Sequence, residues 1–200
     1  MEVGTVGDAD AEGGDCPKKP ETALQLRCGQ GGQAKEAGKE SRLEIVMTLL
    51  LAFGIGIVAG LRSLTAPAVV AWAAHLGWIN IGSSPLRFMG SVWAVVIFTL
   101  LALVEFVNDQ RPTTPARTAA MPLIARIVMG LLTGACLGIA GDIPPWAGAL
   151  AGAVGATVGA FGGYQARVRL VRALRVADIK IAIPEDLVAV GLGLLLVSRF

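Results

Sequence analysis

The sequence GLRSLTAP, residues 60–67, interrupts an apolar segment that runs from Ile45 to Ile79. Residues 45–61 carry no charge and are just long enough to cross a bilayer as one helix. Arg62 follows directly, although a guanidinium at membrane depth is costly. Thr65 is a suitable N-cap, and Pro67 is tolerated in a first helical turn. The stretch therefore predicts a broken or re-entrant membrane helix with its break at Arg62.

The composition is that of a membrane protein. Apolar residues make up 54% of the 200 residues, and the chain holds 26 glycines. Its mean hydropathy of +0.65 exceeds that of ordinary soluble domains. Beyond residue 44 there are eleven bases and six acids, a modest surplus that reflects topology and gives no reason to expect nucleic-acid binding.

The first 44 residues differ from the rest of the chain. They contain nine acidic and six basic residues, no aromatic residue and no apolar period. Such a segment buries too little apolar surface to offset chain entropy. We therefore predict a disordered polar extension over residues 1–44 and a helical transmembrane domain over residues 45–200. Translation from Met47 is an open alternative, in which the extension would not be made.

Apolar segments separated by short polar turns predict an all-α, polytopic integral membrane protein with about five membrane-associated crossings and one broken or re-entrant helix. Five bases lie at residues 167–180, whereas the turn at residues 141–145 has none. The positive-inside rule then places the N-terminus and residues 166–183 on the cytoplasmic side of the membrane. This count holds if Thr65–Ile79 re-enters without crossing. After residues 45–61, the expected crossings cover residues 88–104, 119–140, 146–164 and 187–197.

Two interpretations of Arg62 stay open. A base at the end of a span can reach the interface and complement the helix C-terminus. Alternatively, a half-helix beginning at Thr65 directs its free backbone N–H groups toward Arg62 and forms an anion site.

Glu105 and Asp109 lie four residues apart and share a helix face if the second crossing extends that far. Both acids then stand at a helix C-terminus, where the macrodipole disfavours an anion, so we expect Arg126 to pair with Glu105. The group is either a structural ion-pair network or a cation or proton site. The predicted substrate-binding residues are Arg62, Glu105, Asp109 and Arg126.

Small residues four apart form a packing groove on the fourth crossing. This groove predicts close helix packing within the monomer, a homo-oligomer through the glycine-rich helix, or a substrate path along it. The glycines concerned are Gly148, Gly152, Gly155, Gly159 and Gly163.

The remaining polar residues carry no catalytic pattern. Pro184, Glu185 and Asp186 are typical of a helix start, which predicts capping. Three cysteines and one histidine show no metal-ligand spacing, and no phosphate loop or nucleophile motif occurs. We therefore predict no catalytic residue, metal or cofactor. The expected partners are the lipid bilayer and a second copy, with the ligand unknown.

Several short motifs occur in a fixed order along residues 48–197. Gly-Leu-Arg with a following proline at residues 60–67 comes first, then Glu105, Asp109 and Pro112, then Arg126 and Gly130. This order resembles the bacterial membrane-protein family known as domain of unknown function 4126, with Arg111 where lysine is expected. The resemblance implies a polytopic membrane protein and assigns no reaction.

The favoured function is a small transporter or channel-like protein with an anion-recognising break at Arg62. The alternative is a structural or accessory membrane protein that packs against a partner through its glycine-rich helix. A lipid-acting membrane enzyme is the third candidate, because Glu105 and Asp109 could hold a divalent ion, although two acids are few for a dedicated site.

Overall fold

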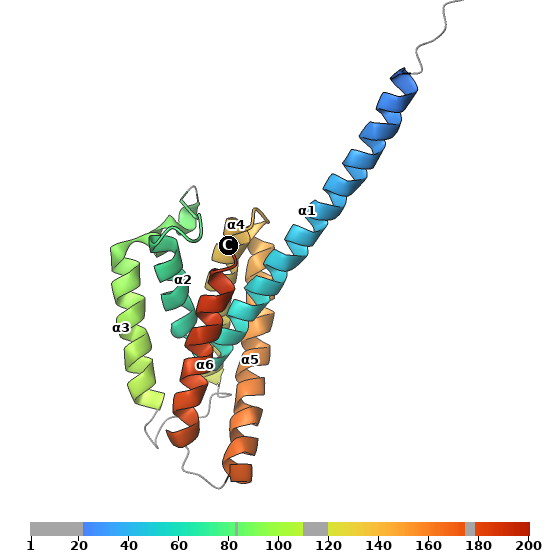
Figure 1. Cartoon of the computed structure of the whole chain (residues 1–200). Helices are drawn as coiled ribbons and strands as arrows, with labels where there is room; N and C mark the ends of the chain where they lie inside the picture. Colours follow the sequence, from blue (N-terminus) through green and yellow to red (C-terminus); the bar gives the residue numbers. More distant parts are fainter. Residues whose placement is uncertain (1–21, 83, 110–119, 175–178) are drawn as a thin grey trace, which may run out of the picture. The chain divides into compact units, whose positions relative to one another are not determined.

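The computed structural model describes residues 22–82, 84–109, 120–174 and 179–200, and all regular structure within these ranges is helical. Six α-helices and one 3₁₀ helix, η1, follow one another along the chain (Figure 1). Their bounds are α1 Thr22–Leu61, α2 Thr65–His75, η1 Pro85–Gly90, α3 Val92–Asp109, α4 Ala120–Ala140, α5 Pro145–Leu174 and α6 Ile179–Val197.

The chain divides into two units, residues 1–40 and 41–200, and α1 contributes to both. This division lies close to the boundary that the sequence predicts between residues 44 and 45. The backbone of residues 22–44 is helical. Residues 1–21 lie outside the described part.

Three helices are long and apolar enough to cross a membrane, over Gly38–Leu61, Ala120–Ala140 and Pro145–Leu170. Two shorter apolar segments, Val92–Asn108 and Asp186–Val197, correspond to the other expected crossings. Because these segments are helical and apolar, they confirm the predicted class of an all-α, polytopic membrane protein.

The predicted helix break is confirmed at residues 62–64, between α1 and α2. From this break α2 runs antiparallel to α3. The Ser63 backbone N–H donates to the Glu105 carboxylate at one end, and the His75 ring lies 3.0 Å from the Gly90 carbonyl oxygen at the other. The break thus joins α1 to α2, and residues 76–91 join α2 to α3.

The contacts of α1 show at which end it enters the helical unit. A Cβ on Gly141 would clash with the Thr48 side chain, so α1 enters the helical unit beside the turn that joins α4 to α5. Helix α5 starts next to that turn and carries residues 166–174 to the opposite end. The N-terminal end of the first candidate span and residues 166–174 therefore lie at opposite ends of the unit.

Glycines bring α1, α4 and α5 into backbone contact. A Cβ on Gly152 would clash with the Gly130 carbonyl of α4, and a Cβ on Gly56 of α1 would clash with the Gly152 carbonyl. The glycine face of α5 therefore packs against α1 and α4 of the same chain. Four of the five predicted glycines have such backbone neighbours on α1 or α4, namely Gly148, Gly152, Gly155 and Gly159.

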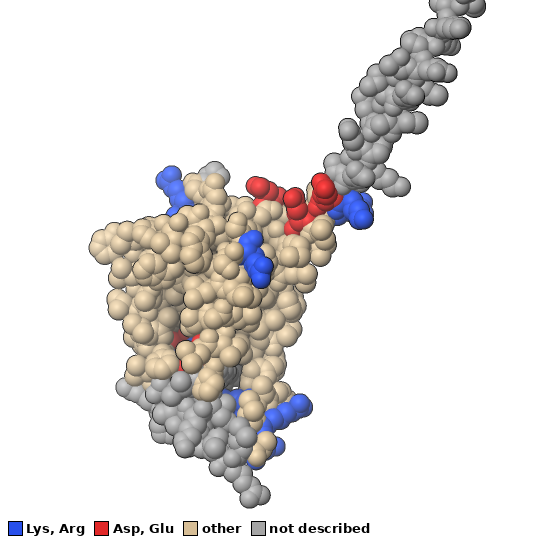
Figure 2. Space-filling model, viewed as in Figure 1, with Lys and Arg blue, Asp and Glu red and all other residues tan. Residues whose placement is uncertain are grey.

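The surface of the 41–200 unit suits a bilayer. Figure 2 shows a broad uncharged surface on this unit. All four tryptophans are exposed, by 44–77% of their surface. Trp78, Trp93 and Trp146 lie at the end that holds η1 and the α4–α5 turn (Figure 1), as expected for an aromatic belt at a membrane–water interface.

We predict that Gly152→Ala lowers the free energy of unfolding by about 1–3 kcal/mol, because the new methyl group meets rigid backbone. Gly162 is the matched control, since it is exposed on the same helix and a Cβ there has no neighbour within 4 Å. Gly162→Ala should leave stability unchanged or raise it by up to about 1 kcal/mol through helix propensity. Thermal unfolding in detergent measures both variants, and equal stability would contradict the packing.

Candidate functional site

Arg62 stands at the end of α1 and is buried. Its backbone N–H donates to the Val58 carbonyl over 2.8 Å, which continues the last turn of the helix, and a cation is favourable at this helix end. Only 2% of the residue is exposed. Its Nε donates to Oδ1 of Asp186 in a buried ion pair. The guanidinium therefore has an internal carboxylate partner from α6.

Asp186 is the residue that the sequence assigned to capping. Helix α6 begins at Ile179 and includes Pro184, so Asp186 lies within the helix and not in its first turn. The residue is 7% exposed. The capping interpretation is therefore wrong for Asp186, which is a counter-charge to Arg62.

The carboxylate of Glu105 holds the backbone of the break. Its Oε1 accepts from the Ser63 backbone N–H at 2.9 Å and from the Ser63 hydroxyl at 2.6 Å, while Oε2 accepts from the Leu64 backbone N–H at 2.9 Å. These donors lie at the start of α2, where the macrodipole favours an anion. Glu105 is thus compensated by the N-terminal end of α2, although it stands near the C-terminal end of its own helix.

Phe106, the next residue on α3, covers the other side of Arg62. The guanidinium carbon lies 5.3 Å from the centroid of the Phe106 ring, within range of a cation–π interaction. Consecutive residues of α3 therefore contact both the break and the buried cation.

The charged residues lie inside the helices and not at their ends. Glu105 is four residues before the end of α3, Arg126 is six after the start of α4, and Asp186 is seven after the start of α6. At a rise of 1.5 Å per residue, these positions are about 6–10 Å from the helix ends. Buried ionisable side chains in a membrane helix are expensive and mark functional sites by default.

The structure brings together part of the predicted site. Arg62 and Glu105 meet at the break, as neighbours of residues 63–64 and Phe106. Arg126 is 4% exposed on α4, but the hydrogen-bond partners of Glu105 are Ser63 and Leu64, so the predicted pairing of Glu105 with Arg126 is not the one found. Asp109 ends α3, and its side chain lies outside the described part.

Sequence reasoning missed Asp186, Ser63 and Phe106. A usable signal was present for Asp186, because a buried Arg62 requires a counter-charge and Asp186 opens an apolar helical segment. The predicted anion site was also incomplete. The prediction did not foresee that the backbone amides just before the half-helix, at Ser63 and Leu64, are bonded to Glu105.

Comparison with known proteins gives one result. The model of a family described as a domain of unknown function (DUF4126) matches residues 49–198, which include every residue of the site. No curated protein and no solved structure gives a match.

We predict strong coupling between Arg62 and Asp186. Removing one member of a buried ion pair, by Arg62→Gln or Asp186→Asn, should cost about 3–5 kcal/mol, because the other charge loses its partner. The double variant should cost clearly less than the sum of the two. Thermal unfolding in detergent measures this cycle. The exposed residues Arg87 and Asp142 provide the control cycle, which should be additive, and additive losses at Arg62 and Asp186 would refute the pairing.

Proposed function

The chain belongs to the DUF4126 family, and from that premise we propose that it is a small membrane transporter whose substrate is an anion recognised by Arg62. The observation that carries this proposal is the buried pair of Arg62 and Asp186 beside the break between α1 and α2. Interrupted helices with buried charges are the usual architecture of substrate sites in secondary transporters.

Stability alone does not explain this pair. A buried ion pair is often no more stabilising than apolar residues of similar volume, because both charges must be desolvated. Glu105 adds a third charge at the same break. Ligand binding explains several energetically costly charges near a helix break better than packing does.

Asp186 occupies the position on Arg62 that an anionic substrate would take. A guanidinium matches carboxylate and phosphate geometry through parallel N–H donors. The described state, in which Asp186 accepts from Nε, is therefore the closed state of the site. An incoming anion competes with the Asp186 carboxylate for the same cation.

Charge balance predicts proton coupling. When an anion replaces Asp186 on the guanidinium, the buried carboxylate loses its counter-charge, which is strongly unfavourable. A proton that enters with the anion compensates its charge, so that the buried site gains no net charge. We therefore expect one proton to enter with each monovalent anion.

The alternative of an accessory protein has less support. It required the glycine face of α5 for a partner, and α1 and α4 cover that face at Gly152 and its neighbours. The charged break has no role in such a protein. Transport uses both features, because the glycine contacts fix three helices while the pair joins α6 to the break.

We also propose that the membrane is the bacterial inner membrane and that residues 166–183 face the cytoplasm. Arg167, Arg169 and Arg172 near the end of α5 support this, with Arg175 and Lys180 following in the sequence. The opposite end carries the exposed tryptophans. Because α1 enters at that opposite end, the N-terminal side of the first crossing then faces away from the cytoplasm.

Reporter fusions test the orientation. Fusions after Asp142 and after Phe200 should report the non-cytoplasmic side, and a fusion after Ala173 should report the cytoplasm. Asp142 precedes α5 and Ala173 lies in its last turn, so the two fusions should always give opposite results. Cytoplasmic activity at Asp142 would reverse the proposed orientation.

We predict that Asp186→Asn increases anion affinity by about tenfold or more, because the internal competitor for Arg62 is removed. The measurement is thermal stabilisation of the purified protein by acetate and by phosphate, followed by uptake of the better anion into proteoliposomes. Arg62→Gln should abolish the response, and Arg62→Lys should weaken it, because an ammonium lacks the planar fork.

Arg87→Gln is the control for general loss of positive charge, since Arg87 is an exposed arginine outside the break. It should respond to both anions as the wild type does. A full response by Arg62→Lys, or the failure of both anions to stabilise Asp186→Asn, would refute anion recognition at Arg62.

A further inference from the structure

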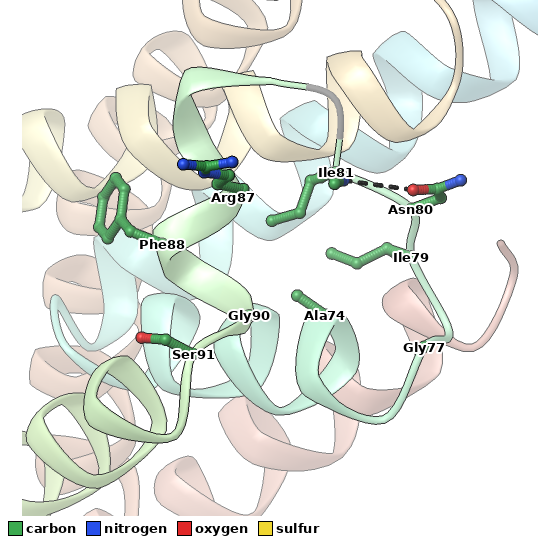
Figure 3. Close-up of a pocket in the computed structure, with 10 residues that line it drawn as sticks. Ala74, Gly77, Ile79, Asn80, Ile81, Arg87, Phe88, Gly90 and Ser91 are labelled. Atoms are coloured by element: carbon green, nitrogen blue, oxygen red, sulfur yellow. Dashed lines mark hydrogen bonds between the residues drawn. The ribbon is translucent and has the colours of Figure 1, made fainter.

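A cavity lies at the C-terminal end of α2, opposite to the break at Arg62. This cavity of about 670 Å³ opens between the end of α2, residues 77–82 and η1. Figure 3 shows the side chains of Ala74, Ile79 and Ile81 directed into this space, with Arg87 at its edge. Ile79 and Ile81 are only 2% and 3% exposed, so they form a closed apolar floor. Arg87 is the one charged residue among the described residues that line the cavity.

The surroundings of the cavity place it at a membrane surface. Trp78 precedes its apolar floor, Phe88 lines it, and Trp93 follows it at the start of α3. These three aromatic residues are exposed by 45%, 49% and 77%. Exposed aromatic residues at one end of a membrane helix bundle lie at the level of the lipid headgroups.

We propose that this cavity binds one anionic phospholipid, with the phosphate at Arg87 and the glycerol region over Ile79 and Ile81. Arginine pairs with phosphate through charge-assisted hydrogen bonds. The acyl chains then lie along the exposed apolar surface of α3, where Val92, Val96 and Leu100 continue downward from the cavity. One cation at the rim, an apolar floor and an adjoining apolar surface match the three parts of such a lipid.

A water-soluble anion does not explain these features as well. It would leave the exposed aromatic residues and the surface of α3 without a role, and a single exposed arginine binds free phosphate weakly. The lipid site is independent of the transport proposal, because it lies at the opposite end of α2 from Arg62.

The test uses the full chain in a neutral detergent. Its thermal stability is measured with added phosphatidylglycerol, with phosphatidylcholine and with inorganic phosphate alone. Phosphatidylglycerol should stabilise the wild type more than phosphatidylcholine does. Inorganic phosphate acts at Arg62, so any response to it should be the same in Arg87→Gln as in the wild type. Arg87→Gln should bind phosphatidylglycerol about tenfold more weakly, as expected for the loss of a charge-assisted hydrogen bond.

Two further variants separate the cavity from general surface charge. Arg199→Gln removes another exposed arginine and should keep the full preference for phosphatidylglycerol. Ala74→Phe fills the cavity without changing the charge and should lose that preference. The melting temperature of Ala74→Phe without lipid reports whether this variant folds. If it does not fold, the result for Arg87→Gln alone tests the proposal. An unchanged preference in Arg87→Gln, an equal loss in Arg199→Gln, or a response to inorganic phosphate that Arg87→Gln removes would overturn the proposal.

Discussion

A guanidinium buried beside a helix break has to be neutralised from within the protein, and the arrangement around Arg62 follows from this requirement. Asp186 supplies the counter-charge from α6, and Phe106 supplies an aromatic face from α3. Glu105, next to Phe106, bonds to the backbone amides of residues 63–64. The break and helices α3 and α6 are distant in sequence. They meet because α3 and α6 supply interactions that the buried charge and the backbone amides of the break would otherwise make with water.

The close approach of α1, α4 and α5 depends on a different property, the absence of side chains. Where Gly56, Gly130 and Gly152 meet, a single methyl group would collide with a carbonyl oxygen. In a bilayer the hydrophobic effect does not drive helices together, so close backbone packing is a main source of attraction between them. The glycines therefore hold these three helices together, while charged and polar contacts connect α2, α3 and α6 at the break.

These two kinds of contact bear on function in different ways. Backbone packing between glycines has no alternative partner, so it is suited to a fixed part of the molecule. An ion pair can exchange one partner for another of the same charge, so Arg62 and Asp186 are suited to a part that changes with ligand binding. Helix α2 links this pair to the Arg87 cavity, which lies at its opposite end.

The amino-acid sequence alone determined the all-α membrane class, the five apolar segments, the break after Arg62 and the glycine groove of α5. These features depend on local composition and residue spacing, which can be read directly from the sequence. The sequence did not determine that Arg62 pairs with Asp186, 124 residues away. Nor did it determine that Glu105 bonds to the break and not to Arg126. Opposite charges in a sequence have many possible partners, and only the packing of the helices selects among them. The direction of α2 was decided in the same way, because a short apolar helix can re-enter or return, and its contacts with α3 determine which occurs.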